Sequence, residues 1–536
     1  MRTLYYNGKV YTGELPLTEA FIVEDGHFSA VGQTEELRQQ KVDRSIDLEG
    51  RFVCAGFNDS HMHLLGFGSS LLKADLARHT GSLQELIAYL KDYFADHSFP
   101  EGKWLEGRGW NQDYFSDVAR MPDRFDLDEV STEIPILITR CCGHACVVNT
   151  KALELAGITA ETVAPVGGAI GLEQGEPDGR FYDNAIDLIT GIISGPDMED
   201  LKAMLLKAAQ KVHSYGITSV QTDDYIVFAD VPFEMVNQAY QELTSSGQLQ
   251  LRVYEQCNFT TVEKFQRFLG SGLRTGQGTE RFKIGPLKLL GDGALGSRTA
   301  HLSKPYLGTD DQVGFDLFTD EQMEEMVALA HKNGMQIAVH AIGDACLDQV
   351  LRAMEKALHD CPREDHRHGI VHCQISRADQ LRKIEELGLQ VYAQSVFLDY
   401  DNHIVEKLVV PEIAQTSYHW KSLIANGVRV SNGSDCPVEL PDVMKGIECA
   451  VTRTSLDGCG PYLPEEAFTV QEALDSFTWK GAEASFEEDR KGRIAPGQLA
   501  DFVILAQDPF ETKGKDLHTI PVKATVIDGQ CVYGSI

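Results

Sequence analysis

The sequence predicts an α/β protein built on a (β/α)8 barrel of the TIM type. Through the middle of the chain, apolar strand-like runs alternate with amphipathic helical segments, which is typical of a parallel sheet. Both ends of the chain consist instead of short strand-like runs with tight turns. One connection, from Leu64 to about Tyr215, is far longer than a barrel connection requires. We therefore expect a barrel with an inserted cap subdomain and a small composite β-sandwich domain from both termini.

The β-sandwich domain is expected from residues 1–54 and 488–536. Both segments contain Asn-Gly or Asp-Gly pairs, which favour the tight turns that join antiparallel strands. The pairs are Asn7-Gly8, Asp25-Gly26 and Asp528-Gly529, and each stands between apolar runs. A hairpin is expected at each of them.

The barrel is expected over residues 55–487. Amphipathic helices separate its strands, for example at Glu321–Asn333, Cys346–His359 and Arg377–Leu387. The eight candidate strands are Phe52–His61, Ile217–Gln221, Leu251–Glu255, Phe282–Leu290, Gln336–His340, Gly369–His372, Leu389–Gln394 and Val428–Asp435.

The long connection after the first strand predicts an insert subdomain over residues 68–205. It contains a helical stretch near Ser82–Phe94 and an apolar strand at Ile134–Thr139. Because it follows a strand at its carboxyl end, we expect the insert to cap the catalytic face of the barrel.

The composition limits the partners of the protein. Lys and Arg number 48 and Asp and Glu 80, which gives a formal net charge of −32. Such a surface repels nucleic-acid phosphates and anionic membranes, so the expected partner is a small-molecule substrate. The 12 cysteines form no regular framework, and no apolar run reaches the ~20 residues that span a bilayer. We expect a soluble cytoplasmic protein, with a homodimer as the candidate assembly.

Two histidines end the first candidate strand. His61 and His63 are two positions apart, so on a strand both imidazoles point the same way and can reach one metal ion. Such a pair is a weak signal alone, and the ends of the other strands strengthen it.

Lys288 stands in an otherwise apolar strand, where an unpaired ammonium group is costly. One explanation is an ion pair with a carboxylate such as that of Asp292. The alternative is that burial lowers the pKa of the lysine, whose neutral amine then reacts with carbon dioxide. The resulting carbamate could bridge two metal ions.

The remaining candidate ligands also lie at strand ends. His340 and His372 end two strands, and Asp435 ends the last one. Catalytic groups of such barrels lie at the carboxyl ends of the strands, so these side chains are expected to converge. Imidazole and carboxylate ligands suit zinc or a similar divalent ion.

These motifs together resemble the amidohydrolase superfamily, and especially its branch of N-substituted formamide deformylases and related metal-dependent hydrolases. The resemblance covers nearly the whole chain. It rests on Gly56-Phe-Asn-Asp-Ser-His-Met-His63, Lys288-Leu-Leu-Gly-Asp-Gly-Ala-Leu-Gly-Ser-Arg-Thr-Ala300, His340-Ala-Ile-Gly-Asp344, His372 and Ser434-Asp435-Cys-Pro-Val438. Cys436 departs from the pattern, since a small residue such as alanine is expected there.

The resemblance implies a centre with two divalent metal ions, expected to be zinc. His61 and His63 would bind the more buried ion, and His340 and His372 the second. Lys288, carboxylated on its side-chain nitrogen, would bridge both ions. Asp435 would be a metal ligand and also the catalytic proton-transfer group.

Five further residues are candidate substrate contacts, each with a structural alternative. Arg298 could meet a substrate carboxylate or form a salt bridge, and Gln394 could line the pocket or form a structural hydrogen bond. His144 could reach the substrate from the insert, and Trp110 and Tyr182 could form apolar pocket walls or belong to a core.

The predicted function is hydrolysis of an amide-type C–N bond by a metal-activated hydroxide, on an N-acyl, N-formyl or cyclic amide substrate. A second hypothesis is a one-metal deaminase or ring hydrolase on the same barrel, in which Lys288 stays unmodified. A third is a ligand-binding barrel without catalysis. The full set of ligands argues against the third.

Overall fold

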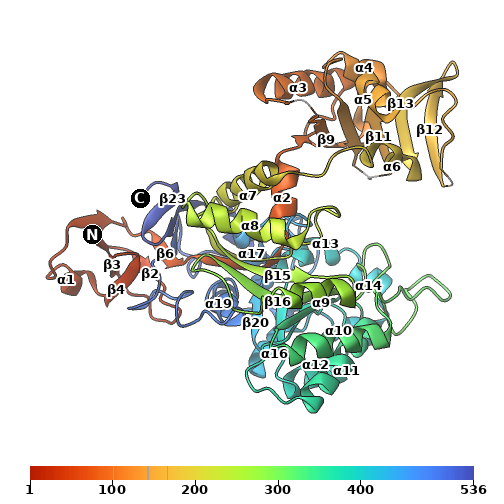
Figure 1. The fold of residues 1–536 in the computed structure, drawn as a ribbon. Coiled ribbons are helices and arrows are strands. Elements are labelled where there is room, and N and C mark those ends of the chain that lie inside the picture. Colours follow the sequence, from red (N-terminus) through yellow and green to blue (C-terminus); the bar gives the residue numbers. More distant parts are fainter. Residues whose placement is uncertain (101, 142–143, 166) are drawn as a thin grey trace. The chain divides into compact units, whose positions relative to one another are not determined.

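The computed structural model describes residues 1–100, 102–141, 144–165 and 167–536. The chain divides into two compact units (Figure 1). The first consists of Met1–Phe67 together with Leu201–Ile536, and the second of Gly68–Asp200. Each unit is described by itself below.

An eight-stranded parallel sheet forms a nearly closed barrel in the first unit, which confirms the predicted barrel. Neighbouring strands follow the chain order, as expected when each strand is joined to the next by a helical crossover. The strands are β7 (Phe57–Met62), β14 (Ile217–Thr222), β15 (Arg252–Asn258), β16 (Phe282–Leu290), β17 (Ile337–Ala341), β18 (Gly369–His372), β19 (Gln390–Ala393) and β20 (Val430–Asn432).

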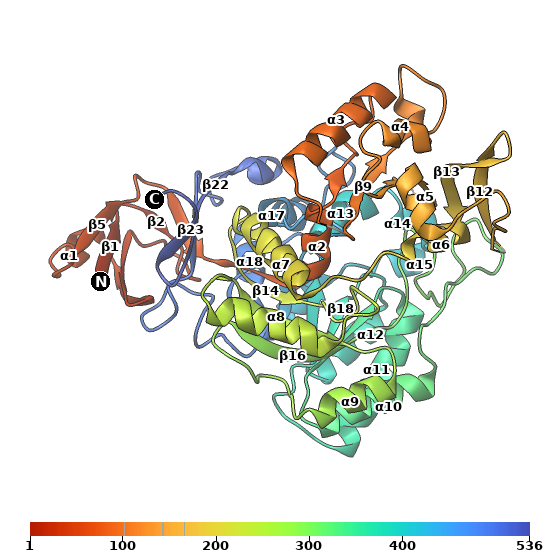
Figure 2. The ribbon, with the colours of Figure 1, turned by 45° about the horizontal axis from the view of Figure 1, so that its top comes forward.

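Helices follow the barrel strands and surround them (Figure 2). They are α2 (Leu64–Leu71), α7 (Met198–His213), α8 (Phe233–Ser245), α9 (Val262–Gly270), α10 (Asp320–Lys332), α11 (Asp344–Asp360), α12 (Ala378–Glu386), α13 (Leu398–Asp401), α14 (Val405–Leu408), α15 (Pro411–Ala414), α16 (Trp420–Ala425), α17 (Val443–Thr452), α18 (Val470–Ser476) and α19 (Trp479–Ala484). No helix in the described part of the chain has the length and apolar character needed to cross a membrane.

The predicted first strand, Phe52–His61, is wrong as a single element. It consists of β6 (Phe52–Ala55), which pairs with a carboxyl-terminal strand, and β7, which begins the barrel. Gly56 separates them. A side chain at Gly56 would lie 2.3 Å from Thr218, so the close packing at this crossing requires glycine. The two strands form one apolar run in the sequence, which hid the change of sheet.

The edges of the barrel sheet, β7 and β20, are joined at their carboxyl ends. The backbone N–H of Asp435 donates to the carbonyl of His61 over 2.8 Å, and that of His63 donates to the carbonyl of Cys436 over 2.7 Å. A side chain at Gly433 would come within 2.5 Å of the His61 backbone nitrogen, so glycine permits this close approach. The residues that follow β7 and the residues that follow β20 therefore lie side by side.

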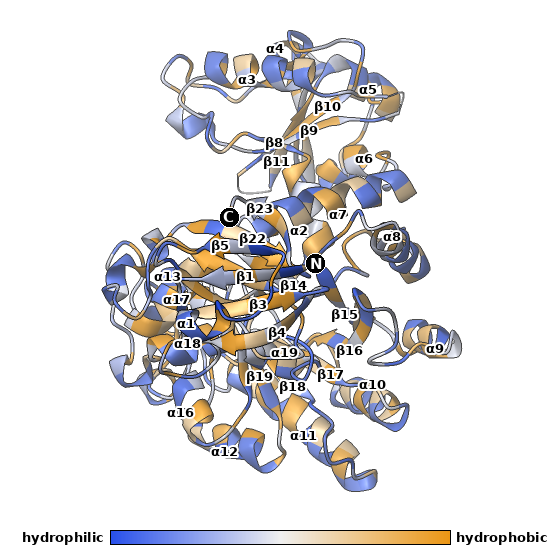
Figure 3. Ribbon diagram, turned by 90° about the vertical axis from the view of Figure 1, so that its left-hand side faces the viewer, coloured by the Kyte–Doolittle hydropathy of each residue, from blue (hydrophilic) through white to orange (hydrophobic). Residues whose placement is uncertain are grey.

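Strands from both chain termini form two further sheets in the same unit. Their buried side chains pack in one hydrophobic cluster that includes Phe21, Val53 and Phe502. Figure 3 shows hydrophobic colouring along β3, whereas the outer helices α11 and α12 carry both colours, as amphipathic helices should. One sheet has the order β4 (His27–Gly32), β3 (Ala20–Glu24), β1 (Arg2–Tyr6), β5 (Arg44–Asp47), and the other β2 (Lys9–Val10), β6, β21 (Phe502–Leu505), β22 (Val522–Ile527), β23 (Gln530–Gly534); a short helix, α1, spans Thr34–Leu37.

Two of the three predicted hairpins are confirmed. The turn at Asp25-Gly26 joins the antiparallel pair β3 and β4, and the turn at Asp528-Gly529 joins β22 and β23. The hairpin predicted at Asn7-Gly8 is wrong, because β1 pairs in one terminal sheet and β2 in the other. The Asn7 side chain donates a hydrogen bond to Asp47. This bond holds the turn through which the chain leaves the sheet of β1 and enters the sheet of β2.

In its described residues, the second unit contains a six-stranded sheet and four α-helices of its own, which are interspersed along the chain. Its hydrophobic core includes Leu86, Leu105, Trp110 and Ile138. The sheet order is β12 (Gly168–Glu173), β13 (Glu176–Asp183), β11 (Ala145–Val148), β10 (Ile136–Arg140), β9 (Leu105–Trp110), β8 (Ala74–Asp75), and the helices are α3 (Leu83–Asp96), α4 (Arg124–Asp128), α5 (Thr150–Ala156) and α6 (Asp187–Thr190). The predicted capping role of this segment stays a prediction.

A buried ion pair ties the barrel to the carboxyl-terminal sheet. Arg252 at the start of β15 donates to both carboxylate oxygens of Asp501, over 2.6 and 3.0 Å, and also to Asp528. The side chains of Arg252 and Asp501 are each only 4% exposed. Removal of one partner from such a pair leaves an uncompensated buried charge.

We predict that Arg252→Met lowers the free energy of unfolding by about 3–5 kcal/mol, because the Asp501 carboxylate loses its counter-ion. Urea unfolding followed by circular dichroism measures the change. Arg267→Met is the control, since Arg267 pairs with Glu234 where both side chains are largely exposed, and it should cost less than about 1 kcal/mol. Equal effects of the two substitutions would contradict the prediction.

Candidate metal centre

All six predicted ligands lie at the carboxyl ends of barrel strands. Strand direction places these ends on one face of the barrel, where the adjoining loops build the site. His61 lies on β7 and His63 directly after it, Lys288 on β16, His340 on β17, His372 at the end of β18, and Asp435 just beyond β20.

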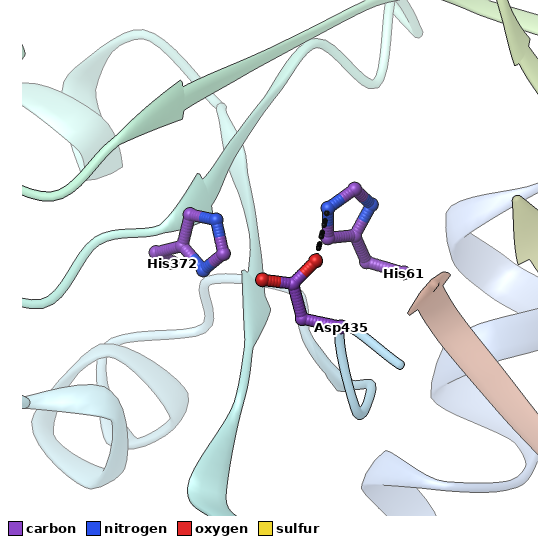
Figure 4. A group of neighbouring side chains, drawn as sticks. All are labelled: His61, His372 and Asp435. Atoms are coloured by element: carbon purple, nitrogen blue, oxygen red, sulfur yellow. Dashed lines mark ion pairs between the residues drawn. The ribbon is translucent and has the colours of Figure 1, made fainter. Parts of the chain in front are cut away.

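The carboxylate of Asp435 lies between two imidazoles. Its Oδ1 is 3.3 Å from His61 Nε2 and 3.1 Å from His63 Nε2. Ligand atoms of His61, His372 and Asp435 all lie within 4.8 Å of one another, and all three residues are buried (Figure 4). Carboxylate and imidazole atoms at these separations could share one metal ion.

A glutamine fixes the orientation of His61. The Nδ1–H of His61 donates to Gln256 Oε1 over 2.7 Å, and Gln256 Nε2 donates to the Ser60 carbonyl over 3.1 Å. The second bond sets which way the amide of Gln256 points. His61 Nδ1 must therefore carry the proton, which leaves Nε2 as a lone-pair donor toward Asp435 and the centre of the site.

The rings of His63 and His372 are held in the same way. His63 Nδ1 donates to the Asp223 carbonyl over 2.9 Å, and His372 Nδ1 donates to Gln394 Oε1 over 2.7 Å. In both rings Nε2 is therefore the atom that could bind a cation, and His63 Nε2 faces Asp435 Oδ1 at 3.1 Å. Hydrogen bonds of this kind fix the tautomer of a metal-binding histidine and raise its basicity.

His340 is oriented differently from the other three imidazoles. Its Nε2 lies 3.1 Å from the Gly293 carbonyl and 3.3 Å from Asp292 Oδ1, so Nε2 carries the proton and Nδ1 is the free atom. Its ring centroid is 4.4 Å from that of His372, and His372 lies 5.7 Å from His61. The structure thus brings the predicted imidazoles together in a contiguous row.

Lys288 is fully buried and faces Asp223. Its Nζ lies 3.7 Å from Asp223 Oδ2, too far for a hydrogen bond. The partner suggested from the sequence, Asp292, is wrong, because the Asp292 carboxylate accepts backbone N–H groups of Ile342 and Gly343 beside His340. Asp223 was missed because it directly follows β14, whose end carries no histidine.

The carboxylate of Asp59 holds the loop that carries Asp435. It accepts the backbone N–H of Ser434 over 3.0 Å and the Ser434 hydroxyl over 2.5 Å. It also accepts the N–H of His61 over 3.2 Å. Its position two residues before His61, on the same face of the strand, is the signal that could have identified it. Burial raises the pKa of Asp59 to about 7.

Burial favours the neutral form of three basic groups of the site. It lowers the pKa of His61, with a further contribution from Lys288, and it lowers the pKa of His372 well below the usual range, aided by His340. Burial also lowers the pKa of Lys288, against the attraction of Asp223. Neutral imidazoles and a neutral amine are the forms that bind a metal or react with carbon dioxide.

His63 and Asp435 form the ionised pair of the site. Burial opposes both charges, but the mutual hydrogen bond outweighs it. The pKa of His63 rises to about 9, and the pKa of Asp435 falls well below its usual range because its carboxylate lies beside the imidazoles of His61 and His63. A divalent ion would replace the proton of His63 as the charge that Asp435 faces.

The hydrogen bonding of the site suits a divalent cation. Within the described residues, Lys288 Nζ and Asp223 Oδ1 are buried without a hydrogen-bond partner. Buried polar atoms without partners are costly, and an ion with its ligands would satisfy them. Ligand atoms of His61, His372 and Asp435 lie within 4.8 Å of one another, and His63 Nε2 lies 3.1 Å from the same carboxylate.

The five candidate substrate contacts fall in different places. Gln394 is fully buried and supports His372, and Arg298 lies half-buried on the loop after β16. His144 pairs with Asp183 over 3.0 Å, Tyr182 lies half-buried on β13, and Trp110 belongs to the core of the second unit. The burial of Trp110 favours its structural alternative. The substrate contacts of His144, Tyr182 and Arg298 stay predictions.

We predict that Gln256→Leu weakens divalent-ion binding about 10–100-fold, because His61 loses the acceptor that fixes its tautomer. Competition between the protein and a chromogenic chelator for Zn²⁺ measures the change. Gln349→Leu is the control, since Gln349 is 4% exposed but lies on α11 away from the ligands. The role assigned to Gln256 fails if both variants bind the ion equally well.

Known proteins resemble this chain over its full length. It is 32% identical to a putative amidohydrolase, YtcJ, of Bacillus subtilis (strain 168), over 99% of each chain. It is 24% identical to an N-substituted formamide deformylase of Arthrobacter pascens, over 96% of this chain and 95% of that one. An uncharacterized metal-dependent hydrolase of Pyrococcus horikoshii OT3 has a solved structure that matches with a TM-score of 0.77 and 27% identity, over 96% of this chain and 99% of the other.

The sequence profile of the amidohydrolase family matches residues 44–533, which span the whole barrel and all six predicted ligands. This match agrees with the position of the histidines, the lysine and the aspartate at the carboxyl ends of the strands. The chain belongs to the amidohydrolase family of metal-dependent hydrolases.

Proposed function

We propose that the protein hydrolyses an amide-type C–N bond of a small molecule, with an N-acyl, N-formyl or cyclic amide as substrate. One observation carries the proposal: Asp435 Oδ1 contacts His61 Nε2 and His63 Nε2 at 3.3 and 3.1 Å. A carboxylate so placed can both bind an ion and exchange a proton with water beside it. The similarity to the N-substituted formamide deformylase of Arthrobacter pascens supports an N-formyl substrate.

Two divalent ions, expected to be zinc, fit the proposed site. His61 and His63 would hold one ion, and His340 and His372 the other, with Lys288 carboxylated between them. Two observations support this assignment. Lys288 Nζ makes no hydrogen bond within the described residues, and the contacts of His340 Nε2 leave Nδ1 as the atom that could bind an ion. When bound, the ions would acidify water and polarise the substrate carbonyl.

Asp435 supplies the proton transfer in this proposal. Its carboxylate accepts a proton from the attacking water and later delivers it to the leaving nitrogen. The contacts to His61 and His63 keep the carboxylate ionised, as its lowered pKa indicates. The bonds of Asp59 to Ser434 hold the loop, so that the carboxylate needs little reorientation between the two steps.

We predict that Asp435→Asn lowers kcat about 10²–10⁴-fold while the fold is kept, because the amide cannot accept the proton. Steady-state assays on a panel of N-formyl and N-acyl amines measure the rate, and circular dichroism checks the fold. Glu466→Gln is the control for loss of a buried carboxylate outside the site, since Glu466 accepts from Ser422. An Asp435→Asn enzyme with unchanged kcat would exclude the proposed role.

A one-metal hydrolase or deaminase is the second candidate function. The proximity of Lys288 to Asp223 favours it, because an unmodified lysine paired with a carboxylate leaves no bridge for a second ion. The third candidate, a barrel without catalysis, is supported by no contact in the described residues.

The number of metal ions per chain distinguishes the two-metal hydrolase from the one-metal enzyme. We predict about two divalent ions per chain by plasma mass spectrometry, as in two-metal hydrolases, and a carbamate signal in ¹³C NMR after growth with ¹³C-bicarbonate. Lys288→Met should remove that signal and at least one ion, because the bridge is lost. About one ion per chain with no carbamate signal would favour the one-metal enzyme.

A homodimer, a cytoplasmic location and the absence of nucleic-acid or membrane partners remain predictions from the sequence. The net charge of −32 supports the last of these. Light scattering of the purified protein measures the assembly directly.

A further inference from the structure

His372 occupies an unusual backbone conformation at the end of β18. Its φ is +75°, and the next residue, Cys373, has a φ of +49°. The N–H of Cys373 is shared between two carbonyls: that of Val371 at 3.1 Å, which closes a γ-turn with His372 at its centre, and that of Ala341 on β17 at 3.2 Å. A γ-turn whose central residue has positive φ is rare and strained, and two successive residues other than glycine in this region are rarer still.

Such a turn persists only where the surrounding structure holds it. The carbonyls of His372 and Cys373 lie beside the side chain of Trp420. Both carbonyls accept one donor, the indole Nε1–H of Trp420, over 3.1 and 3.2 Å. Trp420 begins α16 and is 1% exposed, so no water competes for these carbonyls.

The neighbours of Trp420 hold the indole in place. The Tyr418 ring packs edge-on against Trp420, with centroids 5.4 Å apart. The Tyr418 backbone N–H donates to the Gln374 carbonyl over 2.7 Å. The hydroxyl of Tyr418 and the amide of Gln374 both donate to the buried carboxylate of Asp401. The segment before α16 is thereby joined to the segment that follows His372.

We propose that Trp420 is a positioning residue for the metal centre. Its N–H holds the backbone of His372 in the strained turn, and the turn directs the ring toward Asp435 and His61, beside which Figure 4 shows it. Gln394 then fixes only the rotation of the ring, through Nδ1. The inference rests on the proposed function, in which His372 binds a divalent ion.

The test replaces the indole donor and keeps an aromatic ring. Trp420→Phe should weaken Zn²⁺ binding about 10–100-fold in chelator competition, the usual effect of removing a group that orients a ligand. Trp479→Phe is the matched control, because Trp479 begins α19 and its half-buried ring packs against the cationic side chains of Lys480 and Arg493. The control should bind Zn²⁺ as the unmodified protein does.

A second readout needs no metal. Hydrogen exchange of the Cys373 amide, measured in metal-free protein, should be about tenfold faster in Trp420→Phe, because the turn opens more often. If Trp420→Phe does not fold, replacement of Trp420 by 3-benzothienylalanine keeps the shape of indole and removes only the N–H. The same two effects are then expected.

The outcomes separate this inference from the proposed function. If the unmodified protein binds no divalent ion, the proposed function fails, whereas the exchange of the Cys373 amide still tests whether Trp420 holds the turn. If the unmodified protein binds Zn²⁺ and the Trp420 variants match the Trp479 control in affinity and exchange, the positioning role is overturned while the metal centre stands.

Discussion

The closure of the barrel between β7 and β20 is the constraint on which the site depends. Asp435 and His63 are 372 positions apart in the chain, yet their side chains meet at 3.1 Å. The backbone bonds of Asp435 to His61 and of His63 to Cys436 hold the two strand ends together, and Asp59 reinforces them from inside. A shift of one residue in this pairing would turn the Asp435 side chain away from both imidazoles.

The buried surroundings then determine which forms the ligands adopt. Hydrogen bonds to Nδ1 of His61, His63 and His372 leave three Nε2 atoms directed into the site. Burial lowers the pKa of His61, His372 and Lys288, which favours the lone-pair form of each, whereas the pKa of His63 is raised beside Asp435. Without an ion, Lys288 Nζ and Asp223 Oδ1 lack partners in the described residues, and the centre is therefore electrostatically suited to receive cations.

The barrel and the ligand set could be predicted from the sequence because each depends on local patterns. Alternating strands and helices predict the fold, and polar residues at strand ends predict the site. The partners of these residues could not be predicted, since the contact of Lys288 with Asp223 depends on the packing of separate strands. The Asn7-Gly8 hairpin failed for a related reason, because a turn sequence does not specify which sheet the next strand joins. The strained backbone of His372 leaves no mark in the sequence at all.

The central claim is that a divalent ion is bound where His61, His63 and Asp435 meet, with a second ion beside it. Anomalous diffraction from crystals grown with Zn²⁺ tests it most directly, because the signal locates the ion without assumptions about the ligands. The account predicts a peak within bonding distance of His61 Nε2, His63 Nε2 and the Asp435 carboxylate, about 2.0–2.2 Å from each, and a second peak beside His340 and His372. A peak elsewhere, or none at this site in Zn²⁺-saturated crystals, would contradict it.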